Sequence, residues 1–279
     1  MKHIFIEGIQ GMGKSTLLQT IATKYPKYQV CREGDYSPVE LAWCAWLTEG
    51  EYEEVLKRYE AIREEIVKNT VEEGEHYIVC YTKILTDIPG FHKDLERYEI
   101  YNSRKSFDEM QGIILSRYQR FFQGFAKQFD EVSHEISKGY LFECSFLQNI
   151  VEDLILFHQL DDDEIVDFYK KLYENVDKDK FLLLYLYAEN LEESTSIIKK
   201  ERSDGQGNEM WYPLMLEYLV NSPYGKAHGY KDFDDMVAHF RHRQQLELRI
   251  LREVVGENAV VIPAKAWDEE YLKQLHICD

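Results

Sequence analysis

The segment HIFIEGIQGMGKSTLLQTIATK, residues 3–24, decides the fold of this chain. Residues 3–7 are mostly apolar and predict a buried β-strand, and residues 14–24 predict a helix that Pro26 prevents from continuing far. Between them, residues 8–15 read GIQGMGKS and match the pattern G-x-x-x-x-G-K-[ST] in full. A glycine-rich turn between a strand and a helix is the arrangement through which this pattern binds phosphate.

Each part of this loop suits the binding of an anion. Gly8, Gly11 and Gly13 let backbone N–H groups turn inward, and the N-terminus of the following helix adds a positive partial charge. We expect Lys14 to reach the β- and γ-phosphates of a nucleotide, and the Ser15 hydroxyl to bind Mg²⁺. The expected nucleotide-binding residues of the loop are Gly8, Gly11, Met12, Gly13, Lys14, Ser15 and Thr16.

The rest of the chain alternates predicted strands with predicted helices. Further strands are expected at 28–33, 77–85, 139–144, 181–188 and 259–263. Further helices are expected at 50–73, 106–127, 147–159, 163–176 and 232–255. Because strands joined by helical crossovers pair in parallel, this order predicts an α/β fold in three layers, with a mostly parallel sheet and helices on both faces.

Some of these helices carry clear local signals. Ser106 with Glu109 three residues later predicts a capping box, and apolar residues follow at helical spacing as far as Phe125. The three aspartates at 161–163 suit a helix N-terminus, where the helix dipole favours negative charge. In the acidic stretch 50–73, one predicted apolar face consists of Val55, Tyr59, Ile62, Ile66 and Val67.

Composition excludes several classes of protein. Of the 279 residues, 44% are hydrophobic and 14% aromatic, which supports a packed core and excludes a disordered chain. The net charge of −18 repels phosphate backbones, so we expect no nucleic-acid partner. No run of 18 apolar residues and no signal-peptide pattern occurs, so no membrane association is expected. Five cysteines without a C-x-x-C pair indicate reduced thiols and a cytoplasmic protein.

Three further segments accompany the loop: Arg32-Glu33-Gly34-Asp35 after the second predicted strand, Phe142-Glu143-Cys144-Ser145 at the end of the third core strand, and Lys199-Lys200-Glu201-Arg202 after the fourth. With the loop, they resemble P-loop kinases of the nucleoside and nucleotide monophosphate kinase group, especially deoxynucleoside kinases and thymidylate kinase. The order and approximate spacing match from residue 1 to about 205. The resemblance implies one P-loop NTPase domain over residues 1–279, with a helical acceptor-side insertion at about 49–105 and a lid at about 190–210.

The resemblance also implies where an acceptor binds. The family places a carboxylate and an arginine beside the acceptor at the end of the second strand, which makes Glu33 and Asp35 candidate catalytic acids and Arg32 a candidate substrate ligand. Relatives also bind the acceptor near the long central helix. Arginines in that region of this chain are Arg97, Arg104, Arg117 and Arg120, of which Arg104 is preferred because it precedes the helix cap. Aromatic residues that suit base stacking or a core are Tyr36, Trp43, Trp46, Trp211 and Tyr224, with Tyr36 taken as substrate-binding.

The metal and the transferred phosphoryl group have their own candidate residues. Glu143 follows apolar strand residues at the position where P-loop proteins place the acid that holds Mg²⁺, and Glu189 is the competing candidate. Arg202 is the expected catalytic cation of the lid, with Lys200 as a nucleotide ligand. Cys144 departs from the family, which usually has an arginine there. The cluster at 241–243, Arg-His-Arg, is interpreted as surface.

Together these features predict Mg²⁺-dependent transfer of the γ-phosphoryl group of ATP, or of GTP, to a small acceptor, and the resemblance implies a nucleoside or nucleotide as that acceptor. Two alternatives remain open: a nucleotide-binding switch or regulatory ATPase with a protein partner, and a kinase for a non-nucleotide small molecule. The resemblance also implies a homodimer, formed through the predicted helix at 106–127. The sequence leaves open the acceptor, the choice between ATP and GTP, and the oligomeric state.

Overall fold

The structure is a computed structural model that describes residues 1–123, 139–204, 206–264 and 267–274. Its internal contacts divide the chain into two compact units. Unit 1 comprises residues 1–30 and 130–279, and unit 2 comprises residues 31–129. Unit 2 is therefore one continuous stretch of sequence placed between two parts of unit 1.

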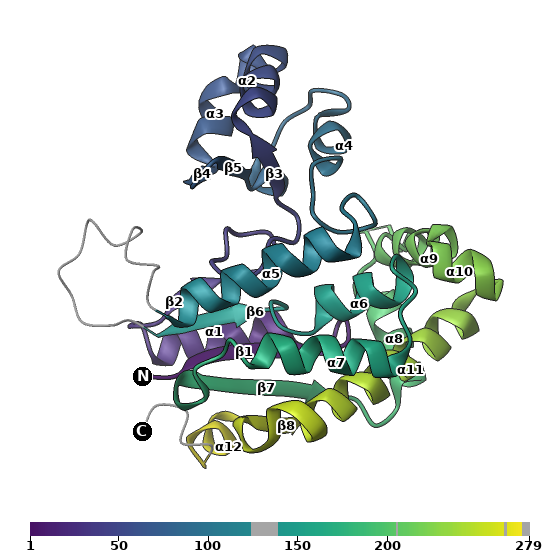
Figure 1. Cartoon of the computed structure of the whole chain (residues 1–279). Helices are drawn as coiled ribbons and strands as arrows, with labels where there is room; N and C mark the ends of the chain where they lie inside the picture. Colours follow the sequence, from purple (N-terminus) through teal and green to yellow (C-terminus); the bar gives the residue numbers. More distant parts are fainter. Residues whose placement is uncertain (124–138, 205, 265–266, 275–279) are drawn as a thin grey trace. The chain divides into compact units, whose positions relative to one another are not determined.

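Unit 1 is built on a five-stranded sheet with the order β2-β6-β1-β7-β8 (Figure 1). Its strands are β1 (His3–Gly8), β2 (Gln29–Cys31), β6 (Tyr140–Glu143), β7 (Phe181–Tyr187) and β8 (Ala259–Pro263). β1 pairs in parallel with β6 and β7, and β7 pairs in parallel with β8. The ring of Phe5 on β1 stacks on those of Phe142 and Phe181, with ring centroids 4.6 and 4.8 Å apart. The apolar runs that predicted β1 and β7 are thus buried at the centre of the sheet.

Helices flank this sheet, which confirms the predicted α/β class with a mostly parallel sheet (Figure 1). They are α1 (Lys14–Lys24), α6 (Gln148–Leu156), α7 (Asp162–Tyr173), α8 (Leu191–Glu201), α9 (Trp211–Asn221), α10 (Pro223–His228), α11 (Phe233–Ile250) and α12 (Glu269–Gln274). α1 contacts β1 and β6, while α11 contacts α6, α7, α8 and α9. Among the residues described, each helix is too short or too polar to cross a membrane.

The residues predicted to begin α7 and to end α11 do so in the structure. Asp161 caps α7 and accepts a hydrogen bond of 2.9 Å from the N–H of Glu164, whose carboxylate accepts one from the N–H of Asp161. α11 continues as a π-helical turn over Leu251–Val255, and the chain then turns at Gly256, whose φ is 66°. The helix predicted at 232–255 is therefore present, with its final turn wider than an α-helix.

Unit 2 contains a three-stranded antiparallel sheet and helices. The strands, in the order β3-β5-β4, are β3 (Ala45–Thr48), β5 (His76–Val79) and β4 (Thr70–Glu73). The helices are α2 (Glu49–Arg58), α3 (Arg63–Lys68), α4 (Phe91–Glu96) and α5 (Phe107–Phe122). Ser106 caps α5 and forms the predicted capping box with Glu109. The part of the predicted helix at 124–127 lies outside the described residues.

Two sequence predictions in unit 2 are wrong in extent. The helix predicted at 50–73 is two helices followed by β4, because residues 70–73 pair with β5 across the turn at Gly74. The strand predicted at 77–85 ends at Val79, and the chain then forms a 3₁₀ turn over Tyr81–Lys83. Pairing between strands, which local composition does not reveal, decides both cases.

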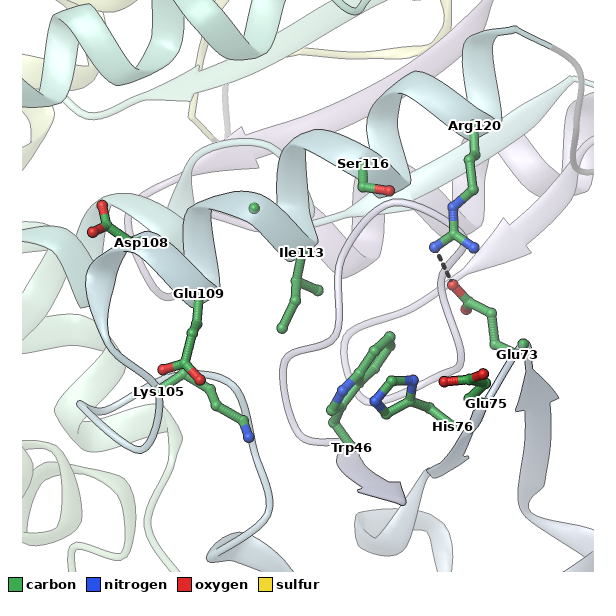
Figure 2. A pocket seen from close by; sticks show the side chains of 12 residues that line it. Trp46, Glu73, Glu75, His76, Lys105, Asp108, Glu109, Ile113, Ser116 and Arg120 are labelled. Atoms are coloured by element: carbon green, nitrogen blue, oxygen red, sulfur yellow. Dashed lines mark hydrogen bonds and ion pairs between the residues drawn. The ribbon is translucent and has the colours of Figure 1, made fainter. Parts of the chain in front are cut away.

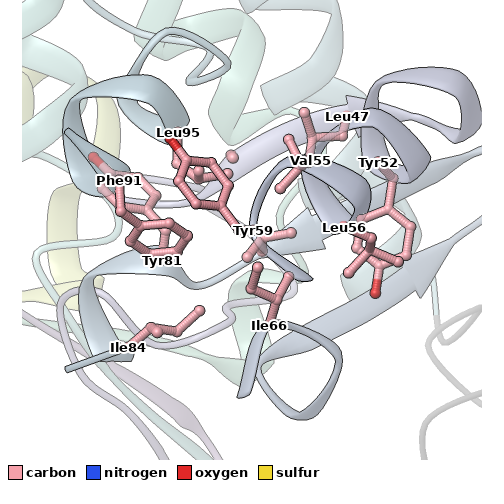
Figure 3. Close-up of a cluster of buried hydrophobic side chains, with 12 residues drawn as sticks. Leu47, Tyr52, Val55, Leu56, Tyr59, Ile66, Tyr81, Ile84, Phe91 and Leu95 are labelled. Carbon is pink, nitrogen blue, oxygen red and sulfur yellow. The ribbon is translucent and has the colours of Figure 1, made fainter. Parts of the chain in front are cut away.

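Side chains from the β3–β5 sheet and helices α2, α3 and α4 form the core of unit 2 (Figure 3). The rings of Tyr52 and Tyr77 stack with centroids 4.4 Å apart, and Tyr59 meets Phe91 edge to face at 5.0 Å. Of the predicted apolar face, Val55, Tyr59 and Ile66 are buried, whereas Val67 is half exposed. The break between α2 and α3 interrupts the helical phase and turns Val67 outward.

Candidate functional site

The glycine-rich loop at residues 8–15 joins β1 to α1 through backbone turns that require glycine. Gly8, Gly11 and Gly13 have φ values of 137°, 79° and 93°. A Cβ on Gly8 would lie 2.5 Å from the carbonyl oxygen of Leu186 on β7, and one on Gly11 would collide with the side chain of Ile198 on α8. Gly13 caps α1, and apart from Gly13 and its two neighbours in sequence no residue that the structure describes has an atom within 4 Å of the position that a Cβ would take. The space beside this first residue of the helix N-terminus is therefore open, which suits an anion.

Lys14 rests on the loop itself. Its side chain is buried, and Nζ donates hydrogen bonds of 2.9 Å to the carbonyl oxygens of Gly8 and Ile9. Met12 is buried beneath the loop, and Thr16 is exposed in the first turn of α1. The predicted phosphate ligand is thus held beside the loop that it is expected to serve.

Ser15 and Glu143, the two predicted metal ligands, are in direct contact. The Ser15 hydroxyl donates a hydrogen bond to Oε1 of Glu143, which ends β6 and pairs in register with Ile6 of β1. A hydroxyl and a carboxylate supply the hard oxygen atoms that Mg²⁺ prefers, and Mg²⁺ in nucleotide sites usually needs only one or two protein ligands. These residues therefore fit the ion. Glu189, the competing candidate, is exposed after the end of β7.

Cys144, the departure from the family pattern, turns into the protein interior. Its φ is 59° and its side chain is fully buried, while its N–H donates to the carbonyl oxygen of Ile6 at 3.2 Å. Asn149 donates a hydrogen bond of 3.1 Å to the carbonyl oxygen of Cys144. A non-glycine residue in this left-handed conformation stores about 1–3 kcal/mol of strain. The strained turn directs the chain inward immediately after Glu143.

The first half of the segment predicted as a lid, at about 190–210, is helix α8, Leu191–Glu201. Ile198 places this helix against Gly11, and Lys200 and Arg202 follow at its exposed C-terminal end. The guanidinium carbon of Arg202 lies 5.6 Å from the centroid of the Trp211 ring, so this tryptophan stacks on a cation. The structure thus places Lys200 in the last turn of α8 and Arg202 at its C-cap, and this helix packs against the glycine-rich loop through Ile198.

Glu7 is a buried charge that sequence reasoning did not assign. It precedes the loop, and its carboxylate accepts hydrogen bonds from the N–H groups of Phe146 at 2.6 Å and Gln148 at 3.0 Å. Burial raises the pKa of Glu7 to about 7, although these two bonds and the charge of Lys14 oppose the rise. The only indication of Glu7 in the sequence is that an acidic residue ends the otherwise apolar predicted strand at residues 3–7.

The prediction of a surface cluster at 241–243 is wrong for Arg243. This side chain is fully buried, and it forms ion pairs of 2.9 Å with Glu152 of α6 and 3.0 Å with Glu247 of α11. Tyr185 of β7 donates a hydrogen bond of 2.6 Å to Glu247, and His239 Nε2 lies 2.9 Å from Glu152. Two buried carboxylates, one on α6 and one a helical turn away on α11 itself, stabilise the arginine inside the protein.

In unit 2, the predicted acids Glu33 and Asp35 belong to one tight turn. The N–H of Asp35 donates to the carbonyl oxygen of Arg32 at 2.9 Å, and Gly34 has a φ of 84°, as at the third residue of a type II turn. Asp35 accepts a hydrogen bond of 3.0 Å from the N–H of Arg32 and forms an ion pair of 2.5 Å with Lys83. Glu33 is exposed and accepts a hydrogen bond of 3.1 Å from the indole of Trp43.

The predicted substrate residue Tyr36 joins a buried cluster around Glu73. Its hydroxyl donates to Glu73 at 2.9 Å, and Arg117 and Arg120 form ion pairs with the same carboxylate. Arg117 is almost fully buried, and it also donates to the carbonyl oxygen of Ser37. Although burial opposes it, the charges of the two arginines lower the pKa of Glu73. The cluster orients Tyr36.

Arg104, the preferred arginine for the acceptor, is bound by acids of its own unit. It forms an ion pair of 3.1 Å with Glu99 and another with Glu96. Glu99 in turn accepts a hydrogen bond of 2.5 Å from the hydroxyl of Tyr81. Any acceptor that binds Arg104 has to compete with these carboxylates.

Unit 2 also contains a pocket of about 630 Å³ between one face of α5 and the β4–β5 turn (Figure 2). The rings of Trp46 and His76 stack in it with centroids 4.2 Å apart. Lys105 and Glu109 line the end near the start of α5, and Arg120 lines the other end, where it pairs with Glu73. The pocket combines an aromatic surface with charges of both signs.

The predicted site residues thus form two groups, one within each unit. Lys14, Ser15 and Glu143 meet in unit 1, while Asp35 and Tyr36 belong to unit 2, and a shared site of the two groups stays a prediction. In the part of the chain that the structure describes, no three His, Cys, Asp or Glu side chains form a metal cage. Comparison of the sequence with models of protein families and with curated proteins finds no match.

Proposed function

We propose that the chain is a Mg²⁺-dependent P-loop kinase that transfers the γ-phosphoryl group of ATP, or of GTP, to a small acceptor. The observation that carries this proposal is the contact between Ser15 and Glu143 beside the glycine-rich loop. It joins the hydroxyl at the start of α1 to the carboxylate at the end of the neighbouring strand, as a nucleotide and metal site requires. The resemblance to nucleoside and nucleotide monophosphate kinases favours a nucleoside or nucleotide as the acceptor.

In this proposal, unit 1 holds the phosphate donor. The backbone N–H groups of the loop bind the phosphates, and Lys14 exchanges the carbonyl oxygens of Gly8 and Ile9 for phosphate oxygens. Ser15 and Glu143 hold Mg²⁺, which when bound supplies positive charge next to the phosphates. Catalysis then consists of positioning and charge stabilisation.

The remaining candidate residues act on the acceptor and on the transferred group. Glu33 or Asp35 orients the acceptor hydroxyl and takes up its proton, and of the two Glu33 is the more exposed. Asp35 has to loosen its ion pair with Lys83 in order to take this role. At the end of α8, Lys200 and Arg202 stabilise the charge that develops on the transferred phosphoryl group. Arg32, Tyr36 and Arg104 complete the proposed set as acceptor ligands.

The test is transfer of labelled γ-phosphate from Mg·ATP to a panel of nucleosides, nucleoside monophosphates and small hydroxylated metabolites. We expect a labelled product with the wild type and none with Lys14→Ala, because the variant lacks the ammonium group beside the loop. A labelled non-nucleotide product would change the acceptor class. Tight ATP binding with phosphate release that no acceptor stimulates would refute the kinase and favour a nucleotide switch.

A further inference from the structure

Two cysteines that are 36 residues apart in sequence lie side by side in unit 2. Ala45 and Val79 are the last facing pair between β3 and β5, so Cys44 and Cys80 are the next facing positions. Their Sγ atoms are 3.6 Å apart, and the side chains are 0% and 4% exposed. The sequence showed no such pair, because the contact depends on strand pairing.

The backbone around the two residues suits a disulfide. The N–H of Cys44 donates to the carbonyl oxygen of Leu41 at 3.2 Å, and that of Cys80 donates to Asn69 at 2.9 Å. The two cysteines therefore do not exchange ladder hydrogen bonds with each other. Facing residues that do not hydrogen-bond to each other across an antiparallel pair have Cα atoms about 4.5 Å apart. This distance lies within the range that a disulfide spans. For the bond to form, the sulfur atoms have to approach from 3.6 Å to about 2 Å.

The two thiols differ in chemical character. Cys44 donates its S–H to the sulfur of Cys80, and this hydrogen bond lowers the pKa of Cys80 against the effect of burial. The charge of Lys83 and the N–H of Tyr36 act in the same direction. The hydrogen bond and burial both raise the pKa of Cys44. Cys80 is also the more exposed of the two, at 4% against 0%, so we assign Cys80 as the nucleophile of the pair and Cys44 as the resolving thiol.

We propose that Cys44 and Cys80 are a redox-active pair that hydrogen peroxide converts into a disulfide. The Cys80 thiolate attacks one peroxide oxygen and breaks the O–O bond, which gives a sulfenic acid and hydroxide; the hydroxide takes up a proton and becomes water. The sulfur of Cys44 then attacks the sulfur of Cys80, forms the S–S bond and expels the second oxygen as water. Two electrons pass from the thiols to the peroxide, and a dithiol reductant reverses the change.

The pair lies directly against the turn that carries Asp35. The sulfur of Cys44 is 3.9 Å from the carbonyl oxygen of Asp35, and the N–H of Lys83 donates to the carbonyl oxygen of Cys80 at 3.1 Å. Oxidation removes the S–H donor and brings the two sulfur atoms from 3.6 Å to about 2 Å apart, which changes their contacts with the carbonyl oxygen of Asp35 and the N–H of Tyr36. This consequence rests on the proposed function: if these residues bind the acceptor, the KM for the acceptor differs between the reduced and oxidised proteins.

The experiment exposes the reduced full-length protein to hydrogen peroxide, alkylates the remaining thiols under denaturing conditions and maps the peptides by mass spectrometry. We expect a peptide pair linked through Cys44 and Cys80, which dithiothreitol separates. The variants Cys31→Ser and Cys144→Ser, which remove other buried thiols, serve as matched controls and should form the same link. In Cys44→Ser, dimedone should label Cys80 as a sulfenic acid.

Full alkylation of Cys44 and Cys80 after a peroxide dose that oxidises free dithiothreitol completely would overturn the proposal, as would links to Cys31 at equal yield. ATP affinity and acceptor KM are then measured for both redox states. A disulfide with an unchanged acceptor KM overturns the coupling to Asp35 and leaves the kinase proposal intact. No transfer in either state overturns the proposed function, while the linked peptide still establishes the redox pair.

Discussion

Replacing Arg243 by methionine isolates the energetic role of the buried ion-pair cluster in unit 1. Methionine keeps much of the length of the arginine side chain but removes its charge from between Glu152 and Glu247. Both carboxylates are buried, so neither has water to replace the lost partner. Breaking a buried pair by removing one member typically costs 3–5 kcal/mol of stability, about the size that we expect here.

The pKa of Glu152 gives a second route to the same magnitude. Although burial opposes it, Arg243 and His239 lower this pKa from its ordinary value of 4.5 to about 2. The difference corresponds to about 3 kcal/mol of stability, which is present above pH 4.5 and lost as the pH falls toward 2. In the variant only His239 still opposes the effect of burial, so we expect the pKa of Glu152 to rise above its value in the unfolded chain. In that case the folded variant binds more protons than the unfolded chain, and its stability relative to wild type improves as the pH falls.

The assay is urea unfolding followed by far-ultraviolet circular dichroism at pH 7.5 and pH 5. We expect Arg243→Met to be less stable than wild type by about 3–5 kcal/mol at pH 7.5, with a smaller deficit at pH 5. Arg241→Met on the exposed side of the same helix is the matched control and should change stability by less than about 0.5 kcal/mol. Equal stabilities of the two variants, or a deficit at pH 5 as large as that at pH 7.5, would refute the reasoning.

Three further predictions concern the site and unit 2. Lys14→Ala should weaken nucleotide binding about 10- to 100-fold in calorimetry, since a charged hydrogen bond contributes about 1.5–3 kcal/mol; an unchanged Kd would contradict the role of Lys14. Glu143→Gln should raise the Mg²⁺ concentration needed for nucleotide binding about tenfold, whereas the control Glu189→Gln should leave it unchanged. If a Mg²⁺ titration gives the same midpoint for both variants, Ser15 and Glu143 do not form the metal site. Glu73→Gln should destabilise the protein by about 3 kcal/mol in urea unfolding, because Arg117 is left buried without a carboxylate, and a change below about 0.5 kcal/mol would show that the pair does not stabilise unit 2.

The fold of unit 1 could be predicted because its signals are local. The buried strand, glycine-rich turn and helix at residues 3–24 follow one another within a short segment, and α1 has the predicted limits. β8 also occupies the predicted residues 259–263. The capping box at Ser106 requires only residues that are three positions apart. Such features depend little on the rest of the protein.

The antiparallel sheet of unit 2 depends instead on contacts between separate segments. β4 consists of residues 70–73 and contains two glutamates, so its composition resembles the acidic helices before it. Its strand conformation comes from pairing with β5 across the turn at Gly74. A strand of four residues has too little periodicity to reveal itself in the sequence.

The same distinction applies to the candidate site. The contact between Ser15 and Glu143 follows from the motif and from a strand end, both of which are visible in the sequence. The burial of Arg243 was not predictable, because it depends on Glu152, 91 residues away in sequence. Neighbouring polar residues on α11 made Arg243 resemble a residue of a solvated helix face. Charged side chains with distant partners are where local patterns fail.

The hydrogen bonds of Lys14 have a consequence for the choice among anions. Its ammonium group already has two carbonyl oxygens at 2.9 Å, from Gly8 and Ile9. If the loop binds a nucleotide as proposed, Lys14 has to exchange both of these contacts for phosphate oxygens. A polyphosphate that also accepts hydrogen bonds from the loop N–H groups at the N-terminus of α1 would offset this loss, whereas a single small anion bound to Lys14 alone would not. Under the proposed function, the resting contacts of Lys14 therefore favour polyphosphates over small single anions.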